Sequence, residues 1–313
     1  MLSLIARRLI TALPLLFVVT ATMFLFTALI PGDPARIILG EAATPAAVEQ
    51  LREQMGLDKP LLVQYVDWVI RAVQLDLGQS IYSGQPVTSI LNERLPVTLS
   101  LILLSTIVIT IVGMSLGMVS ALRGGWVGRA LDAVSLLGIA LPSFWIAVIL
   151  VATLAVAVPI FPATGYTAFE RSPGLWLLGL VLPVIALSLV GVTVVAKQMR
   201  DSVLDVMQKD YVRVLRASGI APHRILFKHV LRNASIPTVT MIGLGAIASL
   251  TGSVFVENVF VLPGLGFVAV SATLKKDLPL LLGLGLYFTL IVILVNLIVD
   301  IVYSILNPKV RLA

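Results

Sequence analysis

Residues 174–196 read GLWLLGLVLPVIALSLVGVTVVA, a run without one charged side chain. A helix needs about 20 apolar residues to cross the hydrocarbon core of a bilayer, which is about 30 Å thick. The run therefore predicts a transmembrane helix. Further runs of this kind cover residues 9–30, 97–122, 131–157, 236–256 and 279–306. We predict an all-α integral membrane protein with six transmembrane helices.

The composition agrees with this class. Of the 313 residues, 58% are hydrophobic and 12% are charged, and the mean hydropathy is +1.05. Because about a quarter of the residues in a soluble domain are charged, this chain has too few charges to coat a water-soluble fold. Cysteine is absent, which excludes disulfides, thiolate nucleophiles and cysteine metal sites.

The positions of lysine and arginine predict the orientation. With the amino terminus in the cytoplasm, 14 of the 22 basic residues lie on the cytoplasmic side. Cytoplasmic loops carry the excess of such residues, so we expect both termini to be cytoplasmic. Arg7 and Arg8 precede the first run as they would in a signal peptide, but the run is too long and lacks a cleavage site. We interpret it as a retained anchor.

Residues 32–94 are predicted to form a small external helical segment between the first and second transmembrane helices. Thr44 followed by Pro45 predicts a helix over 45–55 that ends at Gly56, and a second helix is expected over 61–74. About sixty residues are too few for the core of an independent enzyme domain. The expected division is an amino-terminal end with the first helix at 1–31, the external segment at 32–94, and a five-helix core at 95–313 with a cytoplasmic loop at 197–235.

A basic segment separates the fourth and fifth runs. Residues 209–237 read KDYVRVLRASGIAPHRILFKHVLRNASIP. Asp210 can cap a first helix, Gly219 can adopt the left-handed conformation that ends it, and Pro222 suits the first turn of a second helix. We interpret the segment as the place where the chain contacts a cytoplasmic partner.

One face of the first of these helices is a candidate contact surface. Tyr211, Leu215 and Ser218 share that face, because residues three and four apart are neighbours on a helix. A DNA-binding helix-turn-helix would look similar over this window. Membrane spans on both sides argue against nucleic acid as a partner.

A second irregular segment follows the fifth run. The sequence PGLG at 263–266 breaks the helix before an apolar stretch that is too short to cross a bilayer. We expect a re-entrant or surface-lying helix, because non-helical backbone at membrane depth must be buried in protein or line a wet cavity. The segment would then lie near a translocation path. An ordinary external loop is the alternative.

Several kinds of chemistry find no support. The sequence has no G-x-x-x-x-G-K-[ST] phosphate loop and no H-E-x-x-H, and His223 and His229 are spaced wrongly to grip a metal from one helical face. GMSLG at 113–117 matches G-x-S-x-G, so Ser115 could be read as the nucleophile of an intramembrane hydrolase. The same residues spell G-x-x-x-G, which permits close helix packing, and we favour packing.

Short motifs recur in order along nearly the whole chain. They are PGDP at 31–34, GLDKP at 56–60, QY at 64–65 with Trp68, DLG at 76–78, RLP at 94–96 with TL at 98–99, ENVF at 257–260 and PGLG at 263–266. In this order they resemble the B-type permease subunit of bacterial dipeptide and oligopeptide ABC transporters, which are binding-protein-dependent transport system inner membrane components. DLP at 277–279 and NPKVR at 307–311 depart from the Asp-Tyr-Pro and Asp-Pro-Arg-x-Arg of that pattern.

The resemblance implies the type I ABC importer permease fold and places the basic segment at the EAA loop, which couples such permeases to their ATPases. Its E-A-A positions hold Arg213, Val214 and Leu215, so both alanines are missing, and the closing proline is replaced by Arg232. Which residues make the contact therefore stays open. The implied coupling residues are Asp210, Tyr211, Arg213, Leu215, Arg216, Ala217, Ser218, Gly219, Pro222, His229 and Arg232.

The resemblance also implies an external gate. Lys275 and Lys276 are expected to contact the acidic surface of a docked binding protein. The residues assigned to this gate or re-entrant segment are Glu257, Asn258, Pro263, Gly264, Gly266, Lys275, Lys276 and Asp277.

The implied function is a multi-pass permease in a bacterial cell membrane that forms half of a translocation path for di- and oligopeptides. Its implied partners are a second, C-type permease in a heterodimer, two cytoplasmic ABC ATPases and an external substrate-binding protein. The chain is expected to bind no cofactor or metal itself and to be no enzyme, since ATP and magnesium belong to the ATPases. The alternatives are import of nickel chelates or another small solute, or an ion-coupled secondary carrier.

Overall fold

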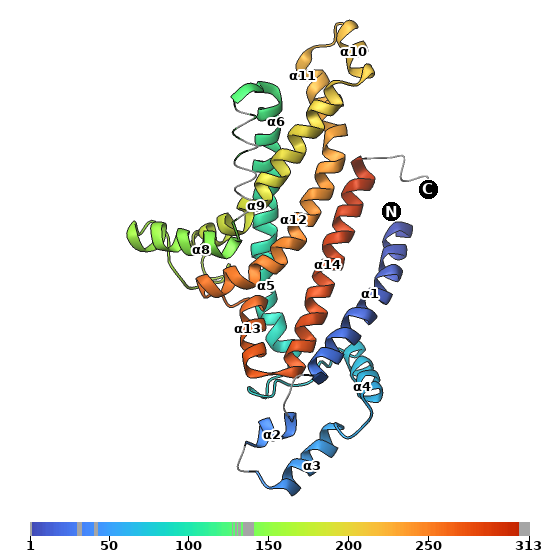
Figure 1. Cartoon of the computed structure of the whole chain (residues 1–313), viewed down its shortest axis with the longest axis vertical. Helices are drawn as coiled ribbons and strands as arrows, with labels where there is room; N and C mark the ends of the chain where they lie inside the picture. The colour runs from blue at the N-terminus through green and yellow to red at the C-terminus, as the bar shows by residue number, and fades with distance from the viewer. Residues whose placement is uncertain are drawn as a thin grey trace. The chain divides into compact units, whose positions relative to one another are not determined.

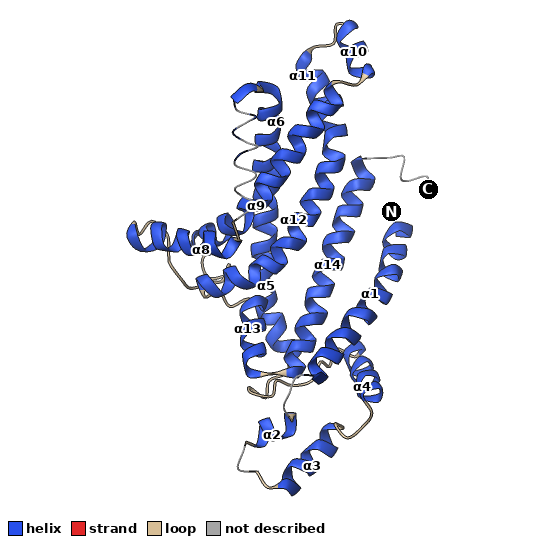
Figure 2. Cartoon of the chain, in the orientation of Figure 1, coloured by secondary structure: helices blue, strands red, loops and turns tan. Residues whose placement is uncertain are grey.

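The computed structural model describes residues 2–29, 33–40, 43–126, 128, 130, 133 and 141–306. Within these ranges the regular elements are helices, and the one extended pairing is an isolated antiparallel bridge between Gln79 and Pro86 (Figure 1, Figure 2). The prediction of an all-α protein is confirmed.

Five helices of the described chain are long and apolar enough to cross a membrane. The second of them is interrupted by a π-helical turn over Ile109–Gly113, and the fourth by one over Ile225–Val230. The five are α1 (Leu2–Leu29), α5 (Val87–Val108) continued by α6 (Met114–Arg123), α9 (Pro173–Met207), α11 (Pro222–Arg224) continued by α12 (Leu231–Phe260), and α14 (Leu278–Leu306).

The predicted span at 131–157 is described mainly from residue 141 onward. There α8 (Ser143–Leu150) runs into a π-helical turn over Val151–Ala157, and together they form a shorter apolar helix. Residues 131, 132 and 134–140 of this predicted span lie outside the described residues.

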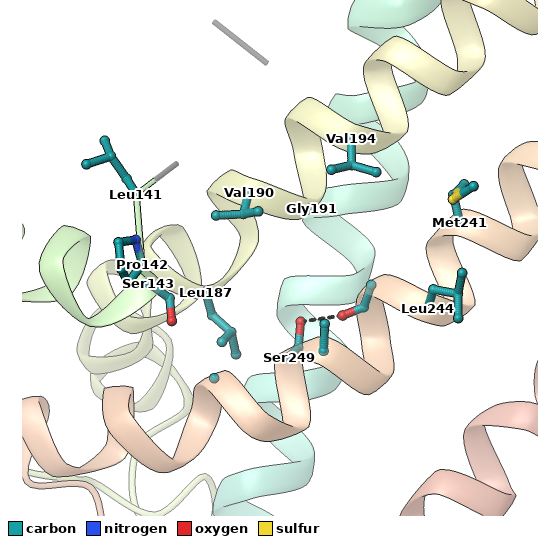
Figure 3. A pocket seen from close by; sticks show the side chains of 13 residues that line it. Leu141, Pro142, Ser143, Leu187, Val190, Gly191, Val194, Met241, Leu244 and Ser249 are labelled. Atoms are coloured by element: carbon teal, nitrogen blue, oxygen red, sulfur yellow. Dashed lines mark hydrogen bonds between the residues drawn. The ribbon is translucent and has the colours of Figure 1, made fainter. Parts of the chain in front are cut away.

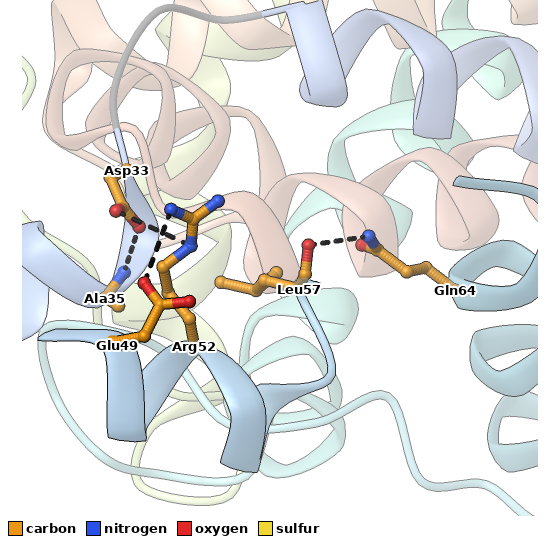
Figure 4. Close-up of polar contacts among 6 residues, drawn as sticks. All are labelled: Asp33, Ala35, Glu49, Arg52, Leu57 and Gln64. Carbon is orange, nitrogen blue, oxygen red and sulfur yellow. Dashed lines mark hydrogen bonds and ion pairs between the residues drawn. The ribbon is translucent and has the colours of Figure 1, made fainter. Parts of the chain in front are cut away.

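The helices predicted between the first two spans form where the capping residues place them. They are α3 (Pro45–Met55) and α4 (Leu61–Val73), and the short helix α2 (Pro34–Leu39), which was not predicted, precedes them. Thr44 Oγ1 accepts a hydrogen bond from the Ala47 amide at 3.4 Å, and Gly56 ends α3 with a left-handed φ of +66°. Close to α3, the Asp33 carboxylate accepts from the Ala35 amide at 3.1 Å (Figure 4).

The chain divides into two compact units, one built from residues of 1–96 and 264–293 and the other from residues of 97–263 and 294–313. In the first unit, α1 packs against α4, and the start of α14 packs against the start of α5. A Cβ on Gly283 would lie 2.6 Å from Val87 Cγ1, so the two helices approach closely there. The Tyr287 hydroxyl donates to Asn92 Oδ1 at 2.6 Å in the same contact.

In the second unit, α9 is the central helix and packs against α6, α8 and α12 (Figure 1). A Cβ on Gly113 would lie 2.9 Å from Val195 Cγ1, and a Cβ on Gly117 would lie 2.7 Å from Met199 Cβ and closer still to the Ala196 carbonyl. The packing interpretation of GMSLG is confirmed. Ser115 itself is exposed.

Two apolar clusters fill the second unit. One joins α5, α8, α9 and the end of α12, with Leu101, Leu180 and Phe260 almost fully buried. The other joins α6, α9, α10 (Asp210–Ala217) and the start of the helix that becomes α12. This second cluster fixes the basic segment onto the ends of α9 and α12.

Candidate functional site

Helix α10 opens the basic segment. Its N-cap is Lys209, whose backbone is extended with φ −69° and ψ 146°, and no side chain caps the helix. The prediction that Asp210 is the cap was wrong by one residue. Asp210 is instead the first helical residue, where the amino-terminal end of the helix dipole favours a negative charge, and its carboxylate lies 3.3 Å from Arg213 Nη1.

The end of α10 agrees with the sequence. Gly219 has φ +73°, and its amide donates to the Arg216 carbonyl at 3.0 Å. A left-handed residue at this position is the usual way to end a helix. Pro222 then begins α11. From there the chain stays helical to Phe260, so the turn at Gly219 is covalently continuous with a membrane span.

The inward face of α10 differs from the predicted one. Val212 is fully buried, and Leu215, three residues later, packs against the same apolar cluster as Met199 and Ile225. Leu215 therefore does not share a free face with Tyr211 and Ser218, which are exposed. The reason is amphipathic spacing: two apolar residues three apart point the helix toward the core.

Two large apolar side chains besides Tyr211 are exposed on this segment, and the sequence analysis did not single them out as contacts. Val214 is 62% exposed and Phe227 is 58% exposed. The signal that identifies Val214 is the same spacing, because placing Val212 and Leu215 inward leaves Val214 outward. Phe227 lies in the π-helical turn, where a period of 3.6 does not predict which side faces the core.

The remaining predicted residues lie on α10, on the turn after it and at the start of the next helix. The Tyr211 hydroxyl accepts a hydrogen bond from Asn233 Nδ2 at 3.0 Å, which ties α10 to the start of α12. His229 is half-buried, and its carbonyl accepts from the same amide nitrogen at 2.9 Å. The exposed members are Arg213, Arg216, Ala217, Ser218, Pro222 and Arg232. The segment therefore exposes both apolar and basic side chains.

A cavity of about 510 Å³ lies lower in the second unit, where α8, α9 and α12 meet (Figure 3). None of its lining side chains is ionisable. Ser249 Oγ donates to the Gly245 carbonyl at 2.9 Å, within α12. A Cβ on Gly245 would meet no atom within 4 Å. The lining residues are Leu141, Pro142, Ser143, Leu187, Val190, Gly191, Val194, Met241, Leu244, Gly245, Ala248, Ser249 and Gly252.

Glu257 lies near the other end of α12 and is completely buried. Its Oε1 accepts a hydrogen bond from Thr98 Oγ1 of α5 at 2.7 Å. Its carbonyl accepts from the Leu262 amide at 2.8 Å, which closes the turn that ends the helix. Val261 in this turn has φ +54°, a left-handed conformation that β-branched residues rarely adopt. The expected break before Pro263 is confirmed.

The short apolar helix that was expected next is α13 (Leu265–Lys275), capped by Gly264. Asp277 follows it and is 2% exposed. Its carboxylate accepts from Ser80 Oγ at 2.5 Å and from the Ile81 amide at 3.3 Å. Asp277 therefore anchors the loop that precedes α5, which sequence reasoning did not foresee.

The other predicted gate residues belong to several elements. Lys275 Nζ lies 5.7 Å from the centroid of the Tyr82 ring, and Lys276 has a left-handed φ of +57°. Gly266 is buried in α13. Asn258 turns back on its own helix, where its Nδ2 donates to the Val254 carbonyl at 2.7 Å. In the described part of the chain, no cluster of three or more His, Asp or Glu side chains could hold a metal ion.

Comparison with known proteins identifies a family. Residues 109–312 match the family described as binding-protein-dependent transport system inner membrane component. Residues 1–102 match its amino-terminal counterpart, described as binding-protein-dependent transport system membrane component, N-terminal. Together these matches cover almost the whole chain.

Related proteins are similar over nearly their full length. A protein of Brucella abortus (strain 2308) named as a peptide transport system permease is 39% identical over 312 residues, 99% of both chains. A protein of Sinorhizobium fredii (strain NBRC 101917 / NGR234) named as a peptide ABC transporter permease is 37% identical over 308 residues, 98% of both chains. The glutathione transport system permease protein GsiC of Escherichia coli (strain K12) is 36% identical over 312 residues, 99% of both chains.

Replacing Thr98 with valine tests the buried bond to Glu257. The substitution keeps the shape but leaves a buried carboxyl group without its hydroxyl donor, so we expect the free energy of unfolding to fall by about 1–3 kcal/mol. Thermal unfolding of the purified protein in detergent measures the change. Thr98→Ser should behave like the unmodified chain.

Thr106→Val is the matched control in the same helix, because Thr106 Oγ1 is buried without a hydrogen-bond partner among the described residues. It should change stability little. Equal midpoints for Thr98→Val and Thr106→Val would show that the Glu257 bond contributes nothing.

Proposed function

This chain belongs to the family of binding-protein-dependent transport system inner membrane components, and so is a membrane permease of an ABC transporter. We propose that its basic segment at 209–237 contacts partner ATPases and transmits their movement to the membrane-spanning helices. The permease imports peptides, in agreement with relatives named for transport of peptides and of glutathione, itself a tripeptide. The proposal concerns how this chain contributes to that import.

The observation that carries the proposal is the exposure of Val214 on α10 and of Phe227 on the following helical turn, in a segment rich in basic side chains. A helix with this pattern suits a groove that is apolar at its centre and acidic at its rim, which is a recurring mode of helix recognition. Helix α10 is clamped by Val212 and Leu215 onto the ends of α9 and α12. A force applied to α10 therefore reaches two membrane-spanning helices through packed side chains.

The proposed partners follow from the family to which the chain belongs. A binding-protein-dependent permease works with an external binding protein and with ATPases. We propose a C-type permease as heterodimer partner, two cytoplasmic ABC ATPases that carry ATP and magnesium, and cytoplasmic termini for this chain in the bacterial cell membrane. Lys275 and Lys276 would face the binding protein, with Glu257, Asn258, Pro263, Gly264, Gly266 and Asp277 shaping the external gate.

The cavity between α8, α9 and α12 is a candidate wall of the path. Its volume of about 510 Å³ lies in the range of small-ligand sites, about 300–1,000 Å³. Its lining carries no charge, so it would not bind the charged ends of a peptide. Such a wall would limit the size of the peptide that passes. The binding protein would select peptides by their side chains.

Replacing Gly219 with valine tests the coupling role. At φ +73° a β-branched residue costs about 1–3 kcal/mol, and we expect α10 to leave its position. Because 1.4 kcal/mol is about a factor of ten, ATP-driven uptake into proteoliposomes should fall by roughly tenfold. The amount of chain in the membrane should stay the same.

Gly219→Asn is the matched control, since asparagine tolerates the left-handed conformation and no atom lies within 4 Å of a Cβ at this position. It should retain most of the uptake. Normal uptake by Gly219→Val, with normal ATPase binding, would contradict the coupling role of this turn.

Replacing Gly245 with leucine tests the cavity as part of the path. The position is open, and leucine favours the helix more than glycine does, so folding should be preserved while the side chain fills the cavity. In Gly245→Leu, uptake of tetrapeptides should fall more than uptake of dipeptides. For each peptide length, uptake by Gly245→Ala should lie between that of Gly245→Leu and that of the unmodified chain. Identical uptake of both lengths by Gly245→Leu would remove the cavity from the path.

A further inference from the structure

Helix α4 (Leu61–Val73) has three distinct faces. At 100° per residue, Tyr65 and Trp68 fall on one face and are 5% and 6% exposed. A second face carries the polar side chains Gln64, Asp67 and Arg71. The third face is apolar and exposed, and we call it the apolar stripe. It consists of Leu62 (73% exposed), Val66 (46%), Ile70 (53%) and Val73 (80%).

The polar face is tied to the loop before the helix. Gln64 Nε2 donates to the carbonyls of Leu57 at 3.2 Å (Figure 4) and Lys59 at 2.7 Å. Asp67 lies 2.8 Å from Lys59 Nζ, and this hydrogen bond raises the pKa of the lysine, which keeps it charged. These bonds fix the rotation of α4 about its own axis. The apolar stripe therefore cannot turn toward the protein interior.

The buried face packs against α1. The Tyr65 hydroxyl donates to the Phe17 carbonyl at 3.2 Å and lies 2.9 Å from Thr20 Oγ1. The Tyr65 ring meets Phe17 and Phe24 edge to face, with centroids 5.7 and 5.5 Å apart. These contacts place α4 beside the middle and the carboxyl-terminal half of α1.

The depth of this contact decides what surrounds the apolar stripe. Helix α1 is apolar enough to cross a membrane over Ala6–Leu29. At about 1.5 Å per residue, Phe24 lies about 8 Å along the axis from Leu29, inside a hydrocarbon core about 30 Å thick, and the Tyr65 side chain reaches further along α1 to the Phe17 carbonyl. A helix that touches α1 at Phe17 and Phe24 therefore lies below the membrane surface, even where α1 is tilted.

We propose that α4 is an interfacial helix embedded in the membrane leaflet at the carboxyl-terminal end of α1, with the apolar stripe against the acyl chains of the lipid. The polar face then reaches the headgroups. This arrangement is the one expected of an amphipathic helix with an apolar and a charged face. Tyr65 and Trp68 are also the residue types that gather at membrane interfaces. Lipid, and not water or a protein, is the partner of the apolar stripe.

The absence of cysteine from the sequence allows a direct test. Single-cysteine variants along α4 carry a nitroxide spin label, and the full chain is placed in nanodiscs of phosphatidylethanolamine and phosphatidylglycerol, both alone and assembled with its partner subunits. Collision rates are measured with oxygen, which partitions into lipid, and with a neutral nickel chelate, which stays in water. The expected result at Leu62→Cys, Val66→Cys and Ile70→Cys is frequent collision with oxygen and little with nickel, alone and in the assembly.

The matched control is Arg71→Cys on the polar face of the same helix, with Glu49→Cys on α3 as a second one. Both should collide with nickel more often than the stripe positions do, by roughly tenfold. Frequent nickel collision along the apolar stripe would mean that α4 stands in water. Loss of both kinds of collision only in the assembly would mean that a protein partner covers the stripe. Either result would overturn the proposal.

Discussion

The close approach of α9 to its neighbours is the constraint on which the second unit depends. Lipid chains are as apolar as the side chains that leave them, so helices in a membrane associate through tight packing and not through the hydrophobic effect. Gly117 on α6 allows contact with the backbone of α9, and a Cβ on Gly252 of α12 would lie 2.8 Å from Leu187 Cδ1. Small residues thus allow α6, α9 and α12 to pack closely.

The basic segment is held in place by this packing. Val212 and Leu215 attach α10 to the cluster between α9 and α12, while Gly219 supplies one sharp turn whose cost is low because glycine has no side chain. The exposed side chains of Val214 and Phe227 are then held in fixed places. A loop with the same residues but without the inward anchors could bind an ATPase, yet it would transmit little movement.

Much of the fold could be predicted from the sequence because it rests on local rules. Apolar length indicated the spans, and Thr44, Pro45 and Gly56 marked helix α3. Gly219 and Pro222 likewise marked the turn of the basic segment. The paired contacts could not be predicted in this way. Glu257 with Thr98, and Asp277 with Ser80, join residues far apart in the chain, and no local pattern indicates such partners.

Two corrections show the same limit. Asp210 is an ordinary cap residue by type, but the extended backbone of Lys209 starts the helix one position earlier. Leu215 was assigned to the contact surface because it shares a helical face with Tyr211. In the structure, however, Leu215 packs against the apolar cluster formed by α6, α9, α10 and the start of α12. The π-helical turns also shift the facing of residues such as Phe227, and a period of 3.6 cannot predict that shift.

The most direct measurement follows the exposure of Val214. Val214→Cys in the chain that otherwise lacks cysteine is treated with a water-soluble maleimide before and after the ATPase subunits are added to the permease pair. If α10 seats in an ATPase groove, the ATPases should slow labelling by at least about tenfold, as expected for a side chain moved into a desolvated interface, while Glu49→Cys keeps its rate. An unchanged labelling rate at Val214→Cys in an assembly that still hydrolyses ATP would contradict the account.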